Sequence, residues 1–241
     1  MVIPNSKGAS MNVRGSILAA VPCAILGGLM CAAPAYAKDD VQRLGVTAKI
    51  YDHGANITGS YTTLLSGSLK ESGPLLRADV SYGSSESRSG VTNERLRANV
   101  LVGYQIAGKG WKTRISAGAA YIDRTGANVG QREGAAAMFK LEAFTGRKGP
   151  IFAAGTAEYI TRDNAYRVAG RVEMRAGRVF IGPEVSLVGS DYFKSTQVGV
   201  SLSNVRLGDI RLTLRGGYAF GSDEGSDRDS PYAGIGTEFR F

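Results

Sequence analysis

Charged side chains recur at every second position in several stretches of the chain, and their spacing is the first clue to chemistry. In 165–175 (AYRVAGRVEMR) and 209–220 (DIRLTLRGGYAF), charged side chains alternate with aliphatic ones. A period of two places the charges on one face of a β-strand and the apolar side chains on the other. Twelve basic and six acidic side chains fall on polar faces of this kind: Lys49, Arg77, Arg97, Lys112, Arg114, Lys140, Arg167, Arg171, Arg175, Arg211, Arg215 and Arg240, with Asp79, Glu142, Glu158, Glu173, Glu184 and Glu238.

This set could form a common charged surface with an excess of cations. Such a surface favours anions or acidic sugars, by the same logic as the charge rings of selective channels. The alternative is a set of interlocking ion pairs that brace the strands, with the excess charge solvated. The sequence does not pair these side chains in space, so both interpretations stay open. The main candidates are Arg77, Arg97, Arg114, Arg167, Arg171, Arg175, Arg211, Arg215, Glu173, Glu184 and Glu238.

Residues for catalysis or metal binding are scarce. His53 is the only histidine, it lies in the connecting segment YDHGAN, and no serine stands in a nucleophile-elbow context. The loop 221–230 (GSDEGSDRDS) contains Asp223, Glu224, Asp227 and Asp229 but lacks the spacing of an EF-hand, so a solvated loop is favoured over a calcium site. We therefore predict a protein that is not an enzyme and has no cofactor or metal.

The first 37 residues read as a secretory signal peptide. A basic start at 11–14 precedes the apolar GSILAAVPCAILGGLM, and Ala35 and Ala37 occupy the small-residue positions before a cut after Ala37. Met11 is a candidate for the true start. The alternative to a signal peptide is a membrane anchor, but the apolar run is short for a membrane-spanning helix. Cleavage would remove both cysteines and change the net charge from +8 to +6, because only Lys7 and Arg14 among the charged residues are lost.

The elements that must position the charges are short alternating strands, and we predict about twelve of them in residues 38–241. Five patterns are clear, at 75–82, 95–106, 111–121, 165–175 and 209–220, and seven are weaker, at 43–51, 57–66, 133–145, 151–161, 179–189, 195–206 and 231–241. No long apolar run follows the signal peptide, so the remaining route through a membrane is a closed barrel. The prediction is an all-β, transmembrane, antiparallel up-and-down β-barrel.

The connections support alternating ends of such a barrel. Short turns are expected at 107–110, 146–149, 176–177 and 207–208, and longer polar loops at 83–93, 123–131 and 221–230, although 52–56 and 162–164 are short for outer loops. Aromatic side chains near strand ends could form interfacial girdles or simply reflect strand preference: Tyr51, Tyr61, Tyr82, Tyr104, Trp111, Tyr121, Tyr159, Tyr218 and Tyr232. A soluble β-sandwich or lipocalin-like barrel would show the same alternation and is the structural alternative.

The final segment GIGTEFRF predicts the closing strand, paired with 43–51. Ile235, Phe239 and Phe241 would face lipid, and Glu238 and Arg240 the lumen. Phe239 and Phe241 also suit the terminal signal that the outer-membrane barrel assembly machinery reads. We therefore expect the outer membrane of a Gram-negative bacterium as the location, its lipid and lipopolysaccharide and that machinery as partners, and no nucleic acid.

Three stretches and the carboxyl terminus carry a family resemblance. VLVGYQI (100–106), 180–208 (FIGPEV onward) and RLTLRGGYAF (211–220) resemble the BcsS family of cellulose-biosynthesis outer-membrane proteins, most sharply at 103–105 and 182–184, over about 95–241. The front half lacks the tryptophan-rich opening expected of that family. The resemblance implies a non-catalytic accessory role in cellulose biosynthesis or secretion, with cellulose synthase components or a glucan chain as partners. The alternative function is an outer-membrane anion or oligosaccharide channel with a basic lumen.

Overall fold

The structure is a computed structural model that describes residues 41–52, 54–86, 92–126, 132–191, 193–208, 210–223, 226–227 and 229–240. The predicted signal peptide with Ala35 and Ala37, the lone histidine His53, Glu224 of the acidic loop and the terminal Phe241 lie outside these described residues. Among the described residues, no helix has the length and apolar character needed to cross a membrane.

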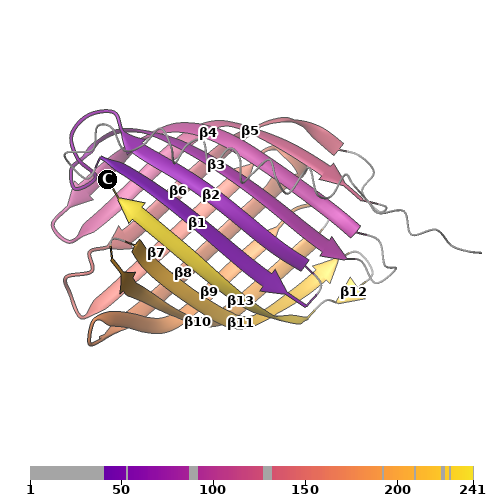
Figure 1. The fold of residues 1–241 in the computed structure, drawn as a ribbon. Coiled ribbons are helices and arrows are strands. Elements are labelled where there is room, and N and C mark those ends of the chain that lie inside the picture. The colour runs from indigo at the N-terminus through magenta and orange to yellow at the C-terminus, as the bar shows by residue number, and fades with distance from the viewer. Residues whose placement is uncertain are drawn as a thin grey trace, which may run out of the picture.

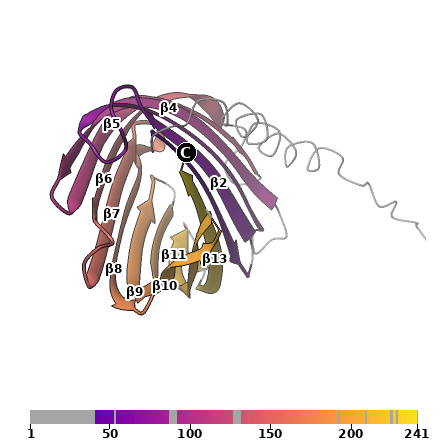
Figure 2. The same cartoon turned by 60° about the vertical axis from the view of Figure 1, so that its left-hand side comes forward.

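Twelve long antiparallel strands form a closed barrel, as predicted (Figures 1 and 2). Each strand pairs with its neighbours in sequence, and β13 closes the ring by pairing with both β11 and β1. A two-residue strand, β12 (Ser226–Asp227), pairs with the end of β11, and a short 3-10 helix, η1 (Arg162–Asn164), connects β7 and β8. The long strands are β1 (Gln42–Tyr51), β2 (Gly54–Leu64), β3 (Gly73–Glu86), β4 (Thr92–Gly108), β5 (Trp111–Thr125), β6 (Arg132–Thr145), β7 (Ile151–Ile160), β8 (Ala165–Ala176), β9 (Val179–Gly189), β10 (Phe193–Leu207), β11 (Ile210–Asp223) and β13 (Ser230–Arg240).

The barrel has two unlike ends. Its first and last strands, β1 and β13, begin and finish at the same end, together with the connections after β2, β4, β6, β8 and β10; we call this the turn end. The connections after the odd-numbered strands gather at the opposite loop end. Two of the predicted long loops, 83–93 and 123–131, are shorter than expected, because their polar residues extend the hairpins of β3 with β4 and of β5 with β6.

The burial pattern separates a transmembrane barrel from a soluble one. On the outer face, Val102 is 62% exposed and Met174 68% exposed, whereas the inward-facing Asp79 is 2% exposed and Glu173 is fully buried. A soluble barrel or sandwich would bury the aliphatic side chains and expose the charges. The inverted arrangement is that of a barrel whose outer wall meets lipid and whose interior is polar.

Not every strand-end aromatic faces outward. Tyr104, Trp111, Tyr121, Tyr159 and Tyr218 are exposed on the outer face, where an interfacial girdle requires them. For Tyr51 and Tyr232 the girdle interpretation is wrong, because both side chains point inward. Tyr51 lies two residues after the inward-facing Lys49, and Tyr232 is the residue paired with Tyr51 on β13. Their rings lie 6.1 Å apart, and Tyr232 is 5% exposed.

The connection between β2 and β3, residues 65–72, folds against the interior at the turn end. Leu69 is 3% exposed and packs with Leu64 and Leu75. The inward-facing Gln105 donates through Nε2 to the carbonyls of Leu69 at 3.2 Å and Glu71 at 2.6 Å. This segment departs from the short turns expected after even strands, and its backbone is fastened to the inner wall.

The inner face also carries an apolar cluster on β4 to β8, where the alternation in the sequence predicts polar side chains. It consists of buried side chains that share the inward parity of the charged positions: Leu101, Ala120, Ile122, Met138, Ile160 and Ala165. This cluster fills part of the interior on that side of the barrel, so the remaining space lies nearer the opposite wall.

Candidate functional site: the charged lumen

The inner wall of β3 to β7 carries a network of paired charges. Arg77 donates from Nε to Asp79 at 2.8 Å and forms an ion pair from Nη1 to Glu142 at 2.9 Å. Lys140 pairs with Glu158 at 2.5 Å and with Asp79 at 3.5 Å. These ion pairs join β3 to β6 and β6 to β7. They form interlocking ion pairs of the kind that the bracing interpretation of the sequence describes.

Two more arginines join the network at its edges. Arg97 on β4 lies 3.6 Å from Glu158, and Arg114 on β5 lies 4.0 Å from Glu142. Arg114 also donates from Nε to the side-chain oxygen of Gln105 at 2.8 Å, which links the network to the fastened 65–72 segment. Every acid of this wall is therefore shared by two cations, and each charge is stabilised at short range.

In the cavity that reaches the turn end, the wall formed by β8 to β11, β13 and β1 contributes seven cations and two acids, whereas β3 to β7 contribute four cations and three acids. Arg171 pairs with Glu173 at 3.4 Å, and Arg215 pairs with Glu184 at 3.6 Å. Arg167 on β8 makes no ion pair with any residue that the structure describes, and its buried Nε has no hydrogen-bond partner there. Charge on this side of the barrel is only partly neutralised.

Glu173 acts as an anchor within the second wall. Its two carboxylate oxygens accept hydrogen bonds from the hydroxyls of Ser201 at 2.7 Å and Ser203 at 2.5 Å. Those serines belong to β10, so the carboxylate of β8 reaches past β9. Gly182 lies on β9 between them, and a Cβ there would collide with the backbone of Val172 and Glu173, so a glycine is needed where β8 and β9 approach closely. The carboxylate thus ties β8 to β10 across β9.

Tyr232 makes a similar crossing from the other direction. Its hydroxyl donates to Glu184 of β9 at 2.9 Å, so its ring passes from β13 over β11 and β10. A Cβ at Gly199 would collide with the hydroxyl, and one at Gly217 would lie 3.0 Å from the ring. Lys49 places its Nζ 4.8 Å from the centre of the same ring, a cation–π contact.

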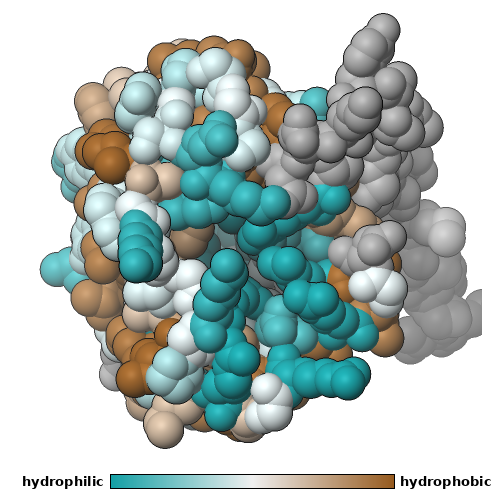
Figure 3. All heavy atoms as spheres, turned by 90° about the vertical axis from the view of Figure 1, so that its left-hand side faces the viewer, coloured by the Kyte–Doolittle hydropathy of each residue, from teal (hydrophilic) through white to brown (hydrophobic). Residues whose placement is uncertain are grey.

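The turn end carries further charges around its opening. Glu238 pairs with Arg240 at 2.6 Å and with Arg43 at 4.0 Å. Arg211 lines the same part of the lumen. Figure 3 shows hydrophilic side chains gathered around a hollow at this end. Arg175 is not among the residues that line this part of the lumen; it donates to the carbonyls of Gly149 and Arg147 and holds the β6–β7 turn.

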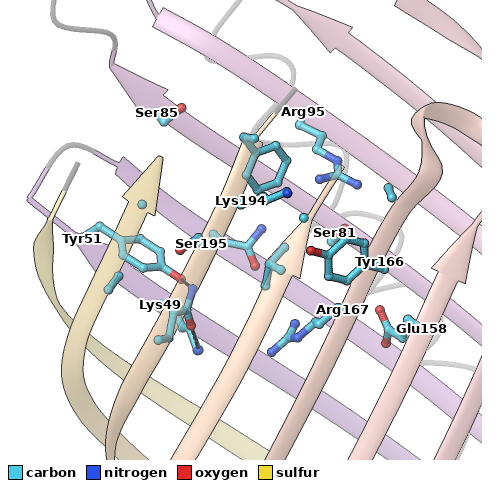
Figure 4. A pocket seen from close by; sticks show the side chains of 18 of the residues that line it. Lys49, Tyr51, Ser81, Ser85, Arg95, Glu158, Tyr166, Arg167, Lys194 and Ser195 are labelled. Carbon is cyan, nitrogen blue, oxygen red and sulfur yellow. Dashed lines mark hydrogen bonds between the residues drawn. The ribbon is translucent and has the colours of Figure 1, made fainter. Parts of the chain in front are cut away.

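Two cavities follow one another along the barrel. One of about 460 Å³ reaches the turn end and is lined by twelve cations and five acids, and one of about 360 Å³ lies toward the loop end (Figure 4). We call the residues that line both cavities the waist: Lys49, Asn56, Thr58, Arg97, Glu158 and Arg167.

The candidates from the sequence occupy different environments. Arg77, Arg97, Arg167, Arg171, Arg211, Arg215, Glu184 and Glu238 line the larger cavity, whereas Arg114 and Glu173 are buried within the wall. Sequence reasoning missed Arg43 and Arg95, which share the inward parity of Lys49 and Arg97 and could have been found by it. It also missed Arg147, because alternation does not say which way a turn residue points. The contact of Tyr232 with Glu184 was missed because it depends on glycines in two other strands.

The chemistry available in the lumen is electrostatic and hydrogen-bonding. Within the part of the chain that the structure describes, no group of His, Cys, Asp and Glu side chains is arranged to hold a metal ion. Buried arginines can bind carboxylate or phosphate through paired donors, and the tyrosine, serine and amide groups can bind hydroxyls.

Solved structures with the same kind of barrel are only distantly related in sequence. The chain resembles LpxR from Salmonella typhimurium at 9% identity, over 83% of this chain and 100% of that chain, with a TM-score of 0.51. It also resembles the NanC porin (14% identity, 83% and 100% coverage, TM-score 0.48) and the KdgM porin (9%, 83% and 99%, 0.45). The LpxR likeness supports the fold and nothing further.

No curated protein sequence matches the chain. The family description "Cellulose biosynthesis protein BcsS" matches residues 46–241, which covers all but the first few residues of the barrel. The chain therefore belongs to the BcsS family of cellulose biosynthesis proteins.

Proposed function

We propose that this protein is a non-catalytic accessory component of cellulose biosynthesis or secretion that resides in the outer membrane of a Gram-negative bacterium. The observation that carries the proposal is a closed barrel with an apolar outer wall in a chain of a cellulose biosynthesis family. Closed barrels satisfy every backbone hydrogen bond in lipid and have no free edge. Components of the cellulose synthase complex or the glucan chain are the proposed partners, beside outer-membrane lipid and lipopolysaccharide.

The test is a deletion strain measured for cellulose output. Cellulose is quantified as glucose released by cellulase, and the strain is complemented with the wild-type gene. Reduced output that complementation restores is the expected result. Normal output in the deletion strain would reject the proposal. Hydrolase activity of the purified barrel that is lost in His53→Ala would contradict its non-catalytic part.

Export and assembly are proposed from the two ends of the chain. Residues 1–37 act as a signal peptide, so the protein recovered from outer membranes should begin at Lys38 by mass spectrometry. Phe239 and Phe241 serve as the signal for the barrel assembly machinery. Deleting Phe241 should lower the folded fraction in outer membranes, measured by heat-modifiable gel mobility, whereas Phe241→Tyr should not. Unimpaired insertion of the truncated protein would count against that role.

A second candidate function is an anion or oligosaccharide channel. It is favoured by the twelve cations against five acids that line the larger cavity. The test is the reversal potential in a planar bilayer under a KCl gradient, which should show selectivity for chloride. Arg171→Gln with Arg215→Gln should reduce that selectivity, because both arginines line the cavity. The matched control is Lys109→Gln with Arg178→Gln, since both residues are exposed in turns.

A further inference from the structure

Charge at the waist of the lumen is uneven. Three cations and a single acid, Glu158, are among the six residues shared by the two cavities. Glu158 is already neutralised, because Lys140 lies 2.5 Å and Arg97 3.6 Å from its carboxylate oxygens. Arg167 also acts on Glu158 electrostatically, so the single carboxylate of the waist is shared among three cations.

Lys49 is buried, with 7% of its surface exposed, and it forms no ion pair with any acid among the described residues. Its Nζ donates to the neutral side-chain oxygen of Gln197 at 2.9 Å. Arg167 and Arg215 act on it electrostatically, and so does one acid, Glu184, which is already paired with Arg215 at 3.6 Å. Burying a cation among other cations is costly unless an anion completes the group.

Arg167 approaches the same space from another side of the barrel. It belongs to β8, which is separated from β1 by β9, β10, β11 and β13. Figure 4 shows Lys49 and Arg167 pointing into the cavity, with Glu158 beyond Arg167. Arg167 makes no ion pair within the described residues, and its buried Nε lacks an acceptor among them. Two incompletely satisfied cations thus converge on one space.

Uncharged hydrogen-bonding groups surround these cations. The Tyr51 hydroxyl accepts from Gln197 at 3.3 Å, and the Thr58 hydroxyl donates to Asn56 at 3.2 Å. Ser81 and Ser195 line the same cavity and are seen with Tyr51 in Figure 4. Its volume of about 360 Å³ is in the range of small-molecule sites. Hydroxyl and amide groups around a cationic centre suit a ligand that carries both hydroxyls and negative charge.

We propose that the waist is a binding site for an anionic saccharide, with its carboxylate held between Lys49 and Arg167 and its hydroxyls facing Tyr51, Asn56 and Thr58. This inference rests on the second candidate function and names the ligand class of its lumen. The apolar cluster of β4 to β8 supports it, since the filled side directs a ligand toward the cation-rich wall. The site would discriminate against a neutral glucan of the same length, because such a chain leaves both cations without a counter-charge.

The test is calorimetric binding to the detergent-solubilised full barrel. The two probes are cellotriose and the same trisaccharide with every C6 hydroxymethyl group oxidised to carboxylate. The oxidised trisaccharide should bind at least about tenfold more tightly than cellotriose, because a hydrogen bond to a charged group typically changes an affinity by about this factor or more. Lys49→Gln with Arg167→Gln should weaken its binding about tenfold or more. Lys49→Arg with Arg167→Lys should retain most of it.

The control is again Lys109→Gln with Arg178→Gln, which removes one lysine and one arginine outside the lumen. Heat-modifiable gel mobility verifies that each variant is folded. Equal binding of both trisaccharides, or undiminished binding to the folded Lys49→Gln and Arg167→Gln variant, would overturn the proposal. If inorganic phosphate binds as tightly as the oxidised trisaccharide, the site recognises anions in general, and the claim that it is specific for a saccharide is rejected. Binding does not require conductance, so a barrel that binds but does not conduct would reject the channel and leave the site standing.

Discussion

At the residue scale, Glu173 shows how one buried carboxylate can join two strands that are not neighbours in the sheet. It is fully buried, accepts two serine hydroxyls from β10 and pairs with Arg171 on its own strand. Alternation placed Glu173 on the inner face, so its position could be predicted. Its partners could not, because the sequence does not show that Ser201 and Ser203 of β10 lie within reach of a carboxylate on β8.

Replacing this carboxylate should therefore destabilise the barrel. Glu173→Ala leaves Arg171 without its acid and both serine hydroxyls without their acceptor, and we expect a loss of about 3 kcal/mol in the free energy of unfolding. Urea unfolding of the protein refolded into lipid vesicles measures the change. Glu133→Ala is the control, since Glu133 is exposed. Equal stability of the two variants would show that Glu173 does not anchor these strands.

At the element scale, the strands themselves were the most predictable feature. Each of the twelve predicted segments overlaps one long strand, because alternation of apolar and polar side chains reports the two faces of a barrel wall directly. The ends were less predictable. Residues 83–86 continue β3 although they are Gly, Ser, Ser and Glu, since pairing with β4 supplies their backbone hydrogen bonds whatever their side chains.

The 65–72 segment is an element that alternation does not describe. Its backbone carbonyls at Leu69 and Glu71 are held by Gln105, a side chain from β4. Gln105→Ala should release the segment and expose the peptide bond after Lys70, so trypsin should cleave there at least several times faster than in the wild type.

Asn204→Ala provides a matched control for this experiment. Asn204 also holds a turn, by donating to the carbonyl of Arg178 at 2.7 Å, but it lies far from 65–72 in the sequence and in a different hairpin. Cleavage after Lys70 should stay at the wild-type rate in that variant. An unchanged rate in Gln105→Ala would mean that other contacts, such as the packing of Leu69 and the hydrogen bond from Lys112 to its carbonyl, fasten the segment without Gln105.

At the scale of the whole molecule, the interior is divided by charge. Acids and bases are interlocked on β3 to β7, while the wall from β8 round to β1 keeps cations such as Arg167 that are incompletely paired. Composition alone gave the excess of positive charge but not its distribution. Ion pairs of the bracing kind occur on both walls, and that the incompletely paired cations of the second wall favour anions stays a prediction.

The apolar outer wall of the barrel should contact lipid along its whole height. Val100 is 56% exposed near the middle of β4, and Leu207 is 61% exposed at the turn end of β10. In a membrane the cost of a charge on the lipid face depends on depth, about 2–4 kcal/mol at the midplane and about 0–1 near the interfaces. Val100→Arg should therefore lose about 2–4 kcal/mol of folding free energy in lipid vesicles, and Leu207→Arg at most about 1.

The comparison between these two variants separates lipid contact from simple surface exposure. In a soluble barrel, both substitutions would place arginine in water, and surface changes of that kind usually cost less than about 0.5 kcal/mol. Measuring the same pair in vesicles of thinner lipid should shrink the difference, because the arginine at position 100 would then lie nearer an interface. Equal small losses at both positions in every vesicle would mean that the apolar outer wall does not span the bilayer.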